Sequence, residues 1–289
     1  MSSNSSDQIH QRSREEWRAL LRRRGIRPER SMGQNFLTDP DVVGAIVESA
    51  AIKRGDDVVE VGPGLGILTR ALLEAGASVT AIELDRDLAE FLRADIREGP
   101  VFSLVEADAR HVDLPENLTG VTWHLVANLP YSTGNVILRH MLEMEHPPAT
   151  ATVMVQKEVA ERMVATAPNM SLLSLAVQVY AEGAIVLVVP PEVFEPPPKV
   201  DSAVVRLLVR PQPLLDVEQR ERLFELATLA FQQKRKTLAN SIARGLSRPK
   251  GEIEGWLAEL GIDPGLRPQA VSLEQWCTLA AAEIPWAGA

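Results

Sequence analysis

Apolar and polar positions along the middle of the chain switch repeatedly between two periods, one typical of buried strands and one typical of amphipathic helices. Short runs rich in valine, isoleucine and leucine are separated by stretches with an apolar residue every three or four positions. This alternation predicts crossover units on a parallel sheet, and therefore a doubly wound α/β fold. The expected strands are 57–61, 78–83, 102–106, 123–127, 152–155, 184–189 and 203–209, and the expected helices are 67–74, 88–97 and 136–144.

Helical periodicity dominates both ends of the chain. A capping-box pair, Ser13 and Glu16, opens a helix that stops at Gly25, and a second pair, Ser272 and Gln275, opens the last expected helix. Further helices are expected from Asp39-Pro40 and at 217–246 and 252–260. We therefore expect three parts: an N-terminal tail and basic helix (1–26), an α/β domain (27–210) and a small all-helical C-terminal domain (211–289).

Length and composition narrow the class of protein. A chain of 289 residues can bury the core of one substantial domain and a smaller one. No uncharged apolar run approaches the roughly 20 residues of a membrane helix, and the polar start lacks the features of a signal peptide. We expect a soluble, cytoplasmic protein with no membrane partner. Cys277 is the only cysteine and the histidines lack the spacing of a metal-binding helix, so we expect no disulfide and no metal.

Charge is unevenly distributed along the sequence. The formal net charge of -9 argues against a generic nucleic-acid binder, because affinity for phosphate comes largely from Lys and Arg. Residues 11–30, however, contain eight arginines against three glutamates, and residues 234–250 contain six basic residues and no acidic one. Each stretch is either a local nucleic-acid contact or an ordinary solvated helix face.

A glycine-rich turn, Gly62-Pro63-Gly64-Leu65-Gly66, joins the first central strand to the following helix. It lacks the third glycine of the dinucleotide fingerprint, and Pro63 removes an amide hydrogen that a pyrophosphate could use. Glu83 ends the next strand, where a carboxylate can accept hydrogen bonds from ribose hydroxyls, and Asp108 follows the strand after it, where it can accept the amine of an adenine. The glycine turn, Glu83 and Asp108 together fit an adenosine whose attached group is a cation and not a phosphate. They therefore predict S-adenosylmethionine as the methyl donor.

The tetrapeptide Asn128-Leu129-Pro130-Tyr131 follows an apolar strand at the carboxyl end of the sheet, where doubly wound folds bind ligands. The Asn128 side chain and the Pro130 backbone carbonyl can accept both hydrogens of a base amino group, and Tyr131 can stack on the base. The attacked sulfonium is already activated, so positioning and electrostatics suffice without a strong general base. The alternative is an ordinary Asn/Pro turn next to a packed tyrosine.

A proline-rich stretch, 190–198, is expected to form a stiff loop, because proline fixes φ and lacks an amide hydrogen. Phe194 lies in this loop. It can supply the second face of an aromatic sandwich around a flipped or single-stranded adenine, and it can equally serve as a core anchor for the loop.

Six motifs occur in a fixed order between about Arg27 and Leu279. They are Gly33-Gln34-Asn35-Phe36-Leu37, Glu60-Val61-Gly62-Pro63-Gly64-Leu65-Gly66, Asn128-Leu129-Pro130-Tyr131, Gln156-Lys157-Glu158-Val159-Ala160-Glu161-Arg162, the run 193–204 that begins Val193-Phe194-Glu195-Pro196, and Phe231-Gln232-Gln233-Lys234-Arg235-Lys236-Thr237-Leu238. In residues and separations they resemble the ribosomal RNA adenine dimethyltransferase family, specifically its small-subunit branch.

The resemblance implies a Rossmann-like class I methyltransferase domain with a helical C-terminal domain that docks on the ribosomal subunit. It implies conversion of two neighbouring adenines, in a hairpin loop near the 3′ end of 16S rRNA, to N6,N6-dimethyladenosine during assembly of the small subunit. The partner would be the immature small subunit, and we expect a monomer. By resemblance, the cofactor site would include Asn35, Leu37, Gly62 and Asn128. The expected RNA contacts are Arg22, Arg23, Lys234, Arg235 and Lys236.

Two departures from the family pattern are visible. Ser132-Thr133-Gly134-Asn135 stands where the family usually carries an Asn-Ile-Ser-Thr type of stretch, and the loop after Arg162 is shortened. Three alternatives stay open: the large-subunit branch, whose members typically have Asn-Ile-Pro-Tyr; a DNA adenine methyltransferase; and an assembly factor that kept the fold and lost activity. Leu129 and the proline-rich loop favour the small-subunit branch.

Overall fold

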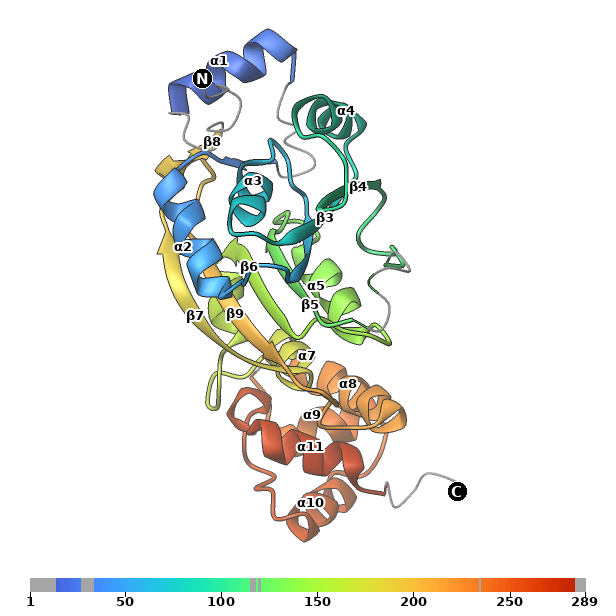
Figure 1. Ribbon diagram of the computed structural model, residues 1–289. Helices are drawn as coiled ribbons and strands as arrows, with labels where there is room; N and C mark the ends of the chain where they lie inside the picture. Colours follow the sequence, from blue (N-terminus) through green and yellow to red (C-terminus); the bar gives the residue numbers. More distant parts are fainter. Residues whose placement is uncertain (1–13, 27–33, 115–117, 119–120, 234, 284–289) are drawn as a thin grey trace, which may run out of the picture. The chain divides into compact units, whose positions relative to one another are not determined.

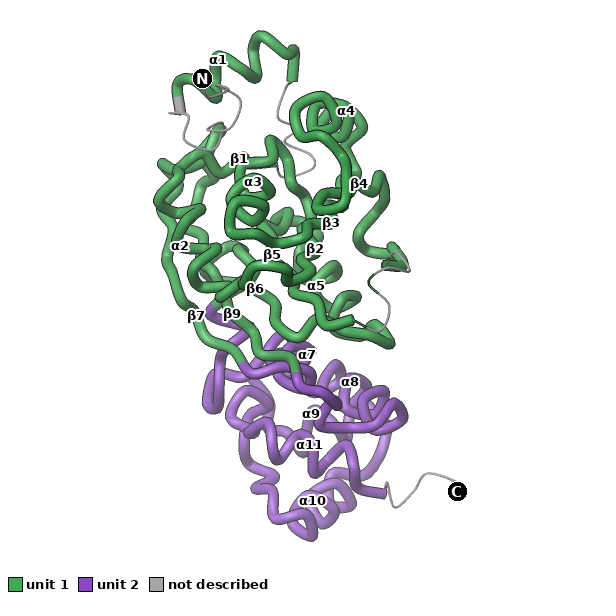
Figure 2. Tube along the Cα trace, viewed as in Figure 1, with its two compact units in different colours: residues 1–160, 183–209 green, residues 161–182, 210–289 purple. Residues whose placement is uncertain are grey.

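The computed structural model describes residues 14–26, 34–114, 118, 121–233 and 235–283 (Figure 1). The chain forms two compact units (Figure 2). Unit 1 contains residues 1–160 and 183–209, and unit 2 contains residues 161–182 and 210–289. Unit 2 thus takes up the segment 161–182, which we expected within the α/β domain, in addition to the C-terminal helices.

Unit 1 is built on a seven-stranded sheet with the order β4-β3-β2-β5-β6-β9-β7. The strands from β4 to β6 run parallel, and β9 is antiparallel to β6. This order reverses on either side of β2, which confirms the doubly wound fold. The strands are β2 (Asp57–Val61), β3 (Ser78–Glu83), β4 (Phe102–Glu106), β5 (Trp123–Asn128), β6 (Thr150–Gln156), β7 (Ala181–Val189) and β9 (Ser202–Val209).

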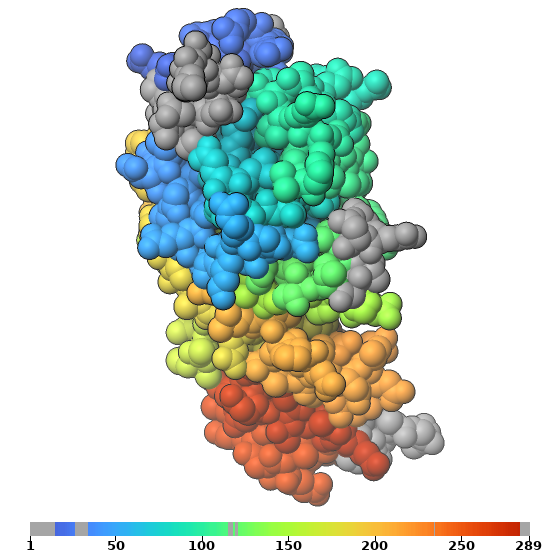
Figure 3. Space-filling model, viewed as in Figure 1, coloured from blue at the N-terminus to red at the C-terminus, as the bar shows by residue number. Residues whose placement is uncertain are grey.

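Helices and strands share an apolar core in which successive strand residues point to opposite faces of the sheet. Val58, Val126 and Val204 belong to one contiguous cluster, and their neighbours Val59 and Val205 are buried as well, so both faces are covered. In the space-filling view (Figure 3), the segment from α2 to α4 makes up much of the face of unit 1 turned to the viewer. The helices are α2 (Pro40–Ala50), α3 (Ile67–Glu74), α4 (Arg86–Asp95) and α5 (Gly134–Glu143), and α6 (Lys157–Met163) contains residues of both units.

Two aspartates fix where helices begin. Asp39 caps α2 as expected: its side chain accepts hydrogen bonds from the backbone N–H groups of Asp41 and Val42, and Pro40 occupies the first turn. Asp85 caps α4 in the same way, directly after β3. The first helix, α1 (Arg14–Arg24), buries Trp17, although Ser13 of its predicted capping box lies outside the described residues.

A second, two-stranded sheet joins β1 (Phe36–Leu37) to β8 (Phe194–Glu195) in antiparallel register. Thr38 extends this pairing, because its backbone N–H and its hydroxyl both donate to the Val193 carbonyl, each at 2.9 Å. The pairing was not predicted from sequence, because strands of two residues leave no periodicity to read. It fastens the segment 34–38, hereafter the arm, to the proline-rich loop.

Unit 2 is helical, and no helix in the part of the chain that the structure describes has the length and apolar character needed to cross a membrane. The predicted single helix 217–246 is wrong: it is interrupted because Thr237 caps a new helix, its side chain accepting from the Asn240 N–H. The predicted Ser272–Gln275 capping box is confirmed. Helices are α7 (Leu172–Gln178), α8 (Val217–Phe231), α9 (Leu238–Gly245), α10 (Lys250–Glu259) and α11 (Leu273–Ala281).

Candidate functional site

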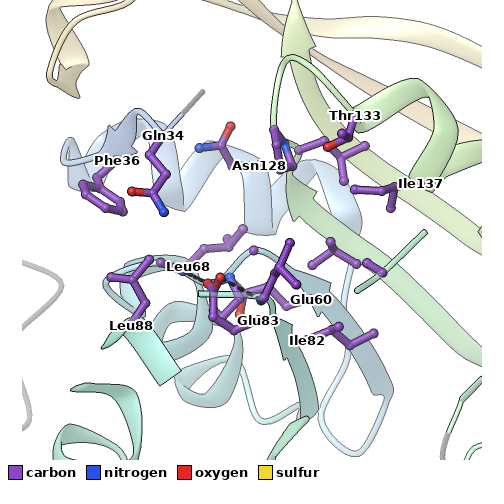
Figure 4. Close-up of a pocket in the computed structure, with 18 of the residues that line it drawn as sticks. Gln34, Phe36, Glu60, Leu68, Ile82, Glu83, Leu88, Asn128, Thr133 and Ile137 are labelled. Carbon is purple, nitrogen blue, oxygen red and sulfur yellow. Dashed lines mark hydrogen bonds between the residues drawn. The ribbon is translucent and has the colours of Figure 1, made fainter. Parts of the chain in front are cut away.

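One cavity of about 280 Å³ opens at the carboxyl ends of β2, β3 and β5 in unit 1. Its position agrees with the rule that doubly wound folds bind ligands where the strand order reverses. Figure 4 shows Gln34, Phe36 and Asn128 on one side of the cavity and Glu60 and Glu83 on the opposite side. The predicted site residues that line it are Asn35, Leu37, Gly62, Gly64, Glu83, Asp108, Asn128, Pro130 and Tyr131.

The glycine turn forms part of the cavity wall with a backbone that other residues rarely adopt. Gly62, Gly64 and Gly66 have φ angles of +68°, +56° and +73°, in the left-handed region that glycine enters without penalty. A Cβ on Gly64 would lie 3.0 Å from the Phe36 ring. The turn therefore has the shape that lets its backbone approach a ligand and pack under the arm.

Glu83 is only 6% exposed, and its carboxylate organises the turn and the start of α4. Its Oε1 accepts from the Leu84 and Asp85 N–H groups, both at 3.0 Å, and its Oε2 accepts from the Gly64 N–H at 3.2 Å. Burial raises the pKa of this carboxyl, and the backbone hydrogen bonds oppose that shift. Since each carboxylate oxygen has two acceptor sites, Oε2 can accept one more donor from the cavity.

Glu60, at 1% exposure, is a second buried carboxyl beside the cavity. Burial and the neighbouring Glu83 charge raise its pKa to about 8. Its Oε2 has no hydrogen-bond partner among the described residues. The cavity wall thus holds a buried carboxyl with one unpartnered oxygen, and a bound cation would stabilise its ionised form.

Asp108 is paired within the chain at the rim of the cavity. Its two carboxylate oxygens accept from the Arg110 Nε at 3.0 Å each, and its Oδ1 also accepts from the Arg110 backbone N–H at 2.9 Å. These hydrogen bonds lower the pKa of Asp108 to about 2, so the group stays ionised. An adenine amine at Asp108 would have to share the carboxylate with this guanidinium.

Asn128 lies where the arm crosses the end of β5. Its Nδ2 donates to the Asn35 carbonyl at 3.3 Å. This bond fixes which end of the amide faces the arm and leaves Oδ1 as the acceptor for a ligand. Oδ1 is the atom that the sequence argument assigned to the amine of the base.

The backbone carbonyl of Pro130 is committed elsewhere, which corrects one expectation. It accepts from the Thr133 N–H at 3.2 Å and from the Gly134 N–H at 2.7 Å, because the chain turns here into α5. Both lone pairs are therefore used inside the protein. The neighbouring Leu129 also lines the cavity, and its carbonyl has no hydrogen-bond partner among the described residues.

Tyr131 is held by its hydroxyl, which is 2.6 Å from the Ser202 Oγ on β9. Burial raises the pKa of the phenol. The hydroxyl is thus neutral and engaged, which leaves the ring face as the part of Tyr131 available to the cavity.

Phe194 does not line the cavity. It is fully buried in the apolar cluster of unit 1, and its backbone pairs with Leu37 in the β1–β8 sheet. Of the two interpretations drawn from sequence, this position is that of a core anchor, since the buried ring presents no free face to a base.

The predicted RNA contacts lie outside the cavity. Arg22 and Arg23 occupy the last turn of α1 and are exposed. Arg235 and Lys236 are exposed between α8 and α9 in unit 2, and Lys234 lies outside the described residues. Among the described residues, no group of three His, Cys, Asp or Glu is placed to hold a metal ion.

Among the cavity residues to which the sequence assigned no individual role are Gln34, Phe36, Glu60 and Arg110. A signal for Glu60 exists, because a carboxylate inside an apolar strand is costly unless it serves a ligand or a partner. Gln34 and Phe36 belong to a motif whose neighbours were singled out. Arg110 has no comparable sequence signal.

A family model described as ribosomal RNA adenine dimethylase matches residues 26–283. The chain is 39% identical over 253 residues to the ribosomal RNA small subunit methyltransferase A of Dehalococcoides mccartyi, covering 87% of each chain. It is 42% identical over 255 residues to the protein of the same name from Desulfitobacterium hafniense, covering 87% of this chain and 91% of the relative.

Two solved structures share the fold over most of their length. The 23S rRNA methyltransferase ErmE superposes with a TM-score of 0.67 at 31% identity, covering 85% of this chain and 98% of that one. A dimethyladenosine transferase from Plasmodium falciparum superposes with a TM-score of 0.71 at 25% identity, covering 84% and 95%. With the family model spanning nearly the whole chain, this protein belongs to the ribosomal RNA adenine dimethylase family.

Proposed function

We propose that this enzyme transfers methyl groups from S-adenosylmethionine to N6 of two adjacent adenosines near the 3′ end of 16S rRNA, giving N6,N6-dimethyladenosines in the immature small subunit. The observation that carries the proposal is the cavity that brings Glu83 and the glycine turn together with Asn128 and Tyr131. Relatives named as small-subunit methyltransferases reach 42% identity, against 31% for the solved 23S enzyme, which favours the small subunit.

The donor site fits an adenosine that carries a positive charge. Glu60 has a buried oxygen without a partner among the described residues, which suits a cationic ligand better than a phosphate. Glu83 retains acceptor capacity for a ribose hydroxyl, and the positive-φ turn at Gly62 and Gly64 leaves room for the methionine end. When bound, S-adenosylmethionine supplies the electrophilic methyl group on its sulfonium. Asp108 is the acceptor for the adenine amine.

Residues of the chain align the target amine. We assign the Asn128 Oδ1 as one acceptor for the N6 hydrogens. The carbonyl of Leu129 replaces that of Pro130 as the second acceptor, because the latter is occupied by two N–H groups. Two acceptors favour a pyramidal nitrogen whose lone pair faces the methyl group, and Tyr131 stacks on the base. The developing positive charge on N6 is stabilised by these oxygens.

RNA binding outside the cavity is assigned to exposed basic residues. Arg22 and Arg23 on α1, and Arg235 and Lys236 in unit 2, are positioned on the surface of their units and can contact phosphates. Lys234 belongs with the second group by sequence. We propose that unit 2 docks on the small subunit, and that the enzyme acts as a cytoplasmic monomer.

The test is to incubate the purified protein with methyl-labelled S-adenosylmethionine and, separately, immature small subunits, naked 16S rRNA or large subunits. Label in the small-subunit RNA, recovered as dimethyladenosine, is the expected result. Label confined to large-subunit RNA would refute the proposal and assign the chain to the large-subunit branch. No transfer to any RNA, with cofactor binding retained, would indicate an assembly factor without activity.

A further inference from the structure

The arm connects the two walls of the cavity through adjacent residues. The Gln34 Nε2 donates to the Asp85 Oδ2 at 2.8 Å on the donor side. One residue later, the Asn35 carbonyl accepts from the Asn128 Nδ2 at 3.3 Å on the target side. Figure 4 shows Gln34 and Asn128 on the same side of the cavity, opposite Glu83. A displacement of Gln34 would therefore move the partner of Asn128.

Asp85 is a firm attachment point for Gln34. Its Oδ1 caps α4 by accepting from the Asp87 and Leu88 N–H groups at 3.0 and 3.2 Å, which leaves Oδ2 for Gln34. Its own N–H donates to the Glu83 Oε1 at 3.0 Å. A continuous set of hydrogen bonds thus runs from the proposed ribose acceptor, through Asp85 and the arm, to Asn128.

The other end of the arm is fastened independently. Phe36 and Leu37 pair with β8, and Thr38 makes two hydrogen bonds to the Val193 carbonyl. The arm is consequently tied at both ends, with Asn35 between the ties. Loss of the Gln34–Asp85 hydrogen bond would leave the β1–β8 pairing intact while removing one constraint on the residue next to Asn35.

The orientation of the Asn128 amide depends on that carbonyl. With Nδ2 bonded to Asn35, the oxygen of the amide is left to accept an N–H of the target. Rotation of the amide by half a turn would present an N–H group to the N–H groups of the base, and the acceptor would be lost. Methyl transfer therefore requires the Asn128 amide to keep this one orientation, whereas docking of the RNA does not.

We propose that Gln34 is a positioning residue: through Asp85 it holds the arm so that the Asn35 carbonyl keeps the Asn128 amide oxygen directed at the target amine. The assignment rests on the function proposed above for the cavity. It predicts a defect chiefly in kcat, because the basic RNA contacts lie outside the cavity and Glu83 keeps its hydrogen bonds from the backbone N–H groups.

Three single variants and one double variant test the assignment by steady-state kinetics on small subunits. Gln34→Ala lowers kcat about tenfold, the effect of losing roughly one hydrogen bond of orientation, with the KM for RNA and the Kd for S-adenosylmethionine within about twofold. Asp85→Ser gives the same loss, because serine still caps α4 but cannot reach Gln34. Asp85→Asn recovers activity to within about twofold, because its Oδ1 still caps α4 and its Nδ2 can donate to the Gln34 Oε1 once the Gln34 amide has turned over.

The double variant Gln34→Ala/Asp85→Ser loses no more kcat than either single change, since each single change already removes the same Gln34–Asp85 hydrogen bond. A double variant whose loss in kcat equals the product of the two single losses would overturn the assignment. So would a wild-type kcat in Gln34→Ala, or a kcat in Asp85→Asn as low as that in Asp85→Ser. A Tm within about 2 °C of the wild-type value in each variant excludes a folding defect, since the loss of a core contact would lower Tm by more than that. Inactivity of the wild-type protein on small subunits would instead refute the proposed function.

Discussion

At the scale of single residues, the cavity is governed by two buried carboxyls that have different tasks. Glu83 is surrounded by backbone N–H groups, whereas Glu60 lies beside it with a raised pKa and an unpartnered oxygen in the described structure. A protonated Glu60 avoids placing two negative charges together in the free protein. A cationic ligand reverses this balance, because it stabilises the ionised form.

Donor affinity should therefore depend on pH. Below pH 8 the free protein holds a proton on Glu60 that a cation must displace, so the Kd for S-adenosylmethionine falls as pH rises and levels off above 8. Proton linkage sets the slope at up to about tenfold per pH unit. Calorimetric titration between pH 6 and 8.5 measures it. The matched Glu60→Gln variant cannot ionise, so it should bind S-adenosylmethionine more weakly and with a Kd that does not change with pH. Equal wild-type Kd values at pH 6 and 8 would contradict the role of Glu60 as a partner of the cation.

Tyr131 should act through its ring and not through its hydroxyl. The hydroxyl is engaged by Ser202, and its pKa is raised, so it supplies no proton acceptor to the cavity. Tyr131→Phe keeps the stacking face and should retain kcat/KM within about fivefold, the effect of one hydrogen bond. Tyr131→Ala should lose roughly 10- to 100-fold, in line with one base stack. If the two variants lose the same amount in a methyl-transfer assay, stacking is not the role of Tyr131.

The sequence predicted cavity residues correctly where the role depends on the side chain and its place at the end of a strand. Glu83 and Asn128 are the last residues of their strands and Asp108 follows another, and the topology brings these strand ends to one cavity. The Pro130 carbonyl was assigned wrongly, because its hydrogen bonds depend on how the chain turns into α5. Arg110 was not foreseen, although it stands two residues after Asp108, because the sequence does not show whether its guanidinium turns toward that carboxylate or toward solvent.

At the scale of elements, long apolar runs were predictable and short pairings were not. The strand β2 and the helix α3 have the predicted bounds, because a short valine-rich run and a clear helical period leave few alternatives. β1 and β8 are two residues long, and only tertiary pairing makes them strands. The break between α8 and α9 was missed because Thr237 acts as a cap inside an otherwise helical pattern.

The helix α1 should stabilise unit 1 by packing and not by charge. Trp17 is fully buried in the core cluster, while Arg18 forms a half-exposed ion pair with Glu195 at 2.7 Å. Trp17→Ala should lower the free energy of unfolding by about 3–5 kcal/mol. The control Arg18→Ala, in the same helix, should cost at most about 1 kcal/mol. Denaturant unfolding measures both; a Trp17→Ala effect as small as the control would show that α1 is not part of the core.

At the scale of the whole molecule, a net charge of -9 makes local basic residues decisive for RNA affinity. Arg22→Ala/Arg23→Ala should weaken binding of small subunits and reduce the slope of log affinity against log salt by about one per arginine. Arg235→Ala/Lys236→Ala should behave alike. The control Arg86→Ala removes an 80% exposed arginine that is paired with Glu90 and should leave the slope unchanged. Equal slopes in all variants would remove these residues from the RNA contact.

The proposed function of the whole molecule is one reaction at one place, the methylation of an amine next to Asn128. The most direct measurement is mass spectrometry of the 3′ fragment of 16S rRNA after immature small subunits react with wild-type protein or Asn128→Ala. The predicted result is two adjacent N6,N6-dimethyladenosines with the wild type and none with Asn128→Ala, which still binds subunits because Asn128 is not a phosphate contact. Methyl groups at other nucleotides, or an unchanged yield in the variant, would contradict the account.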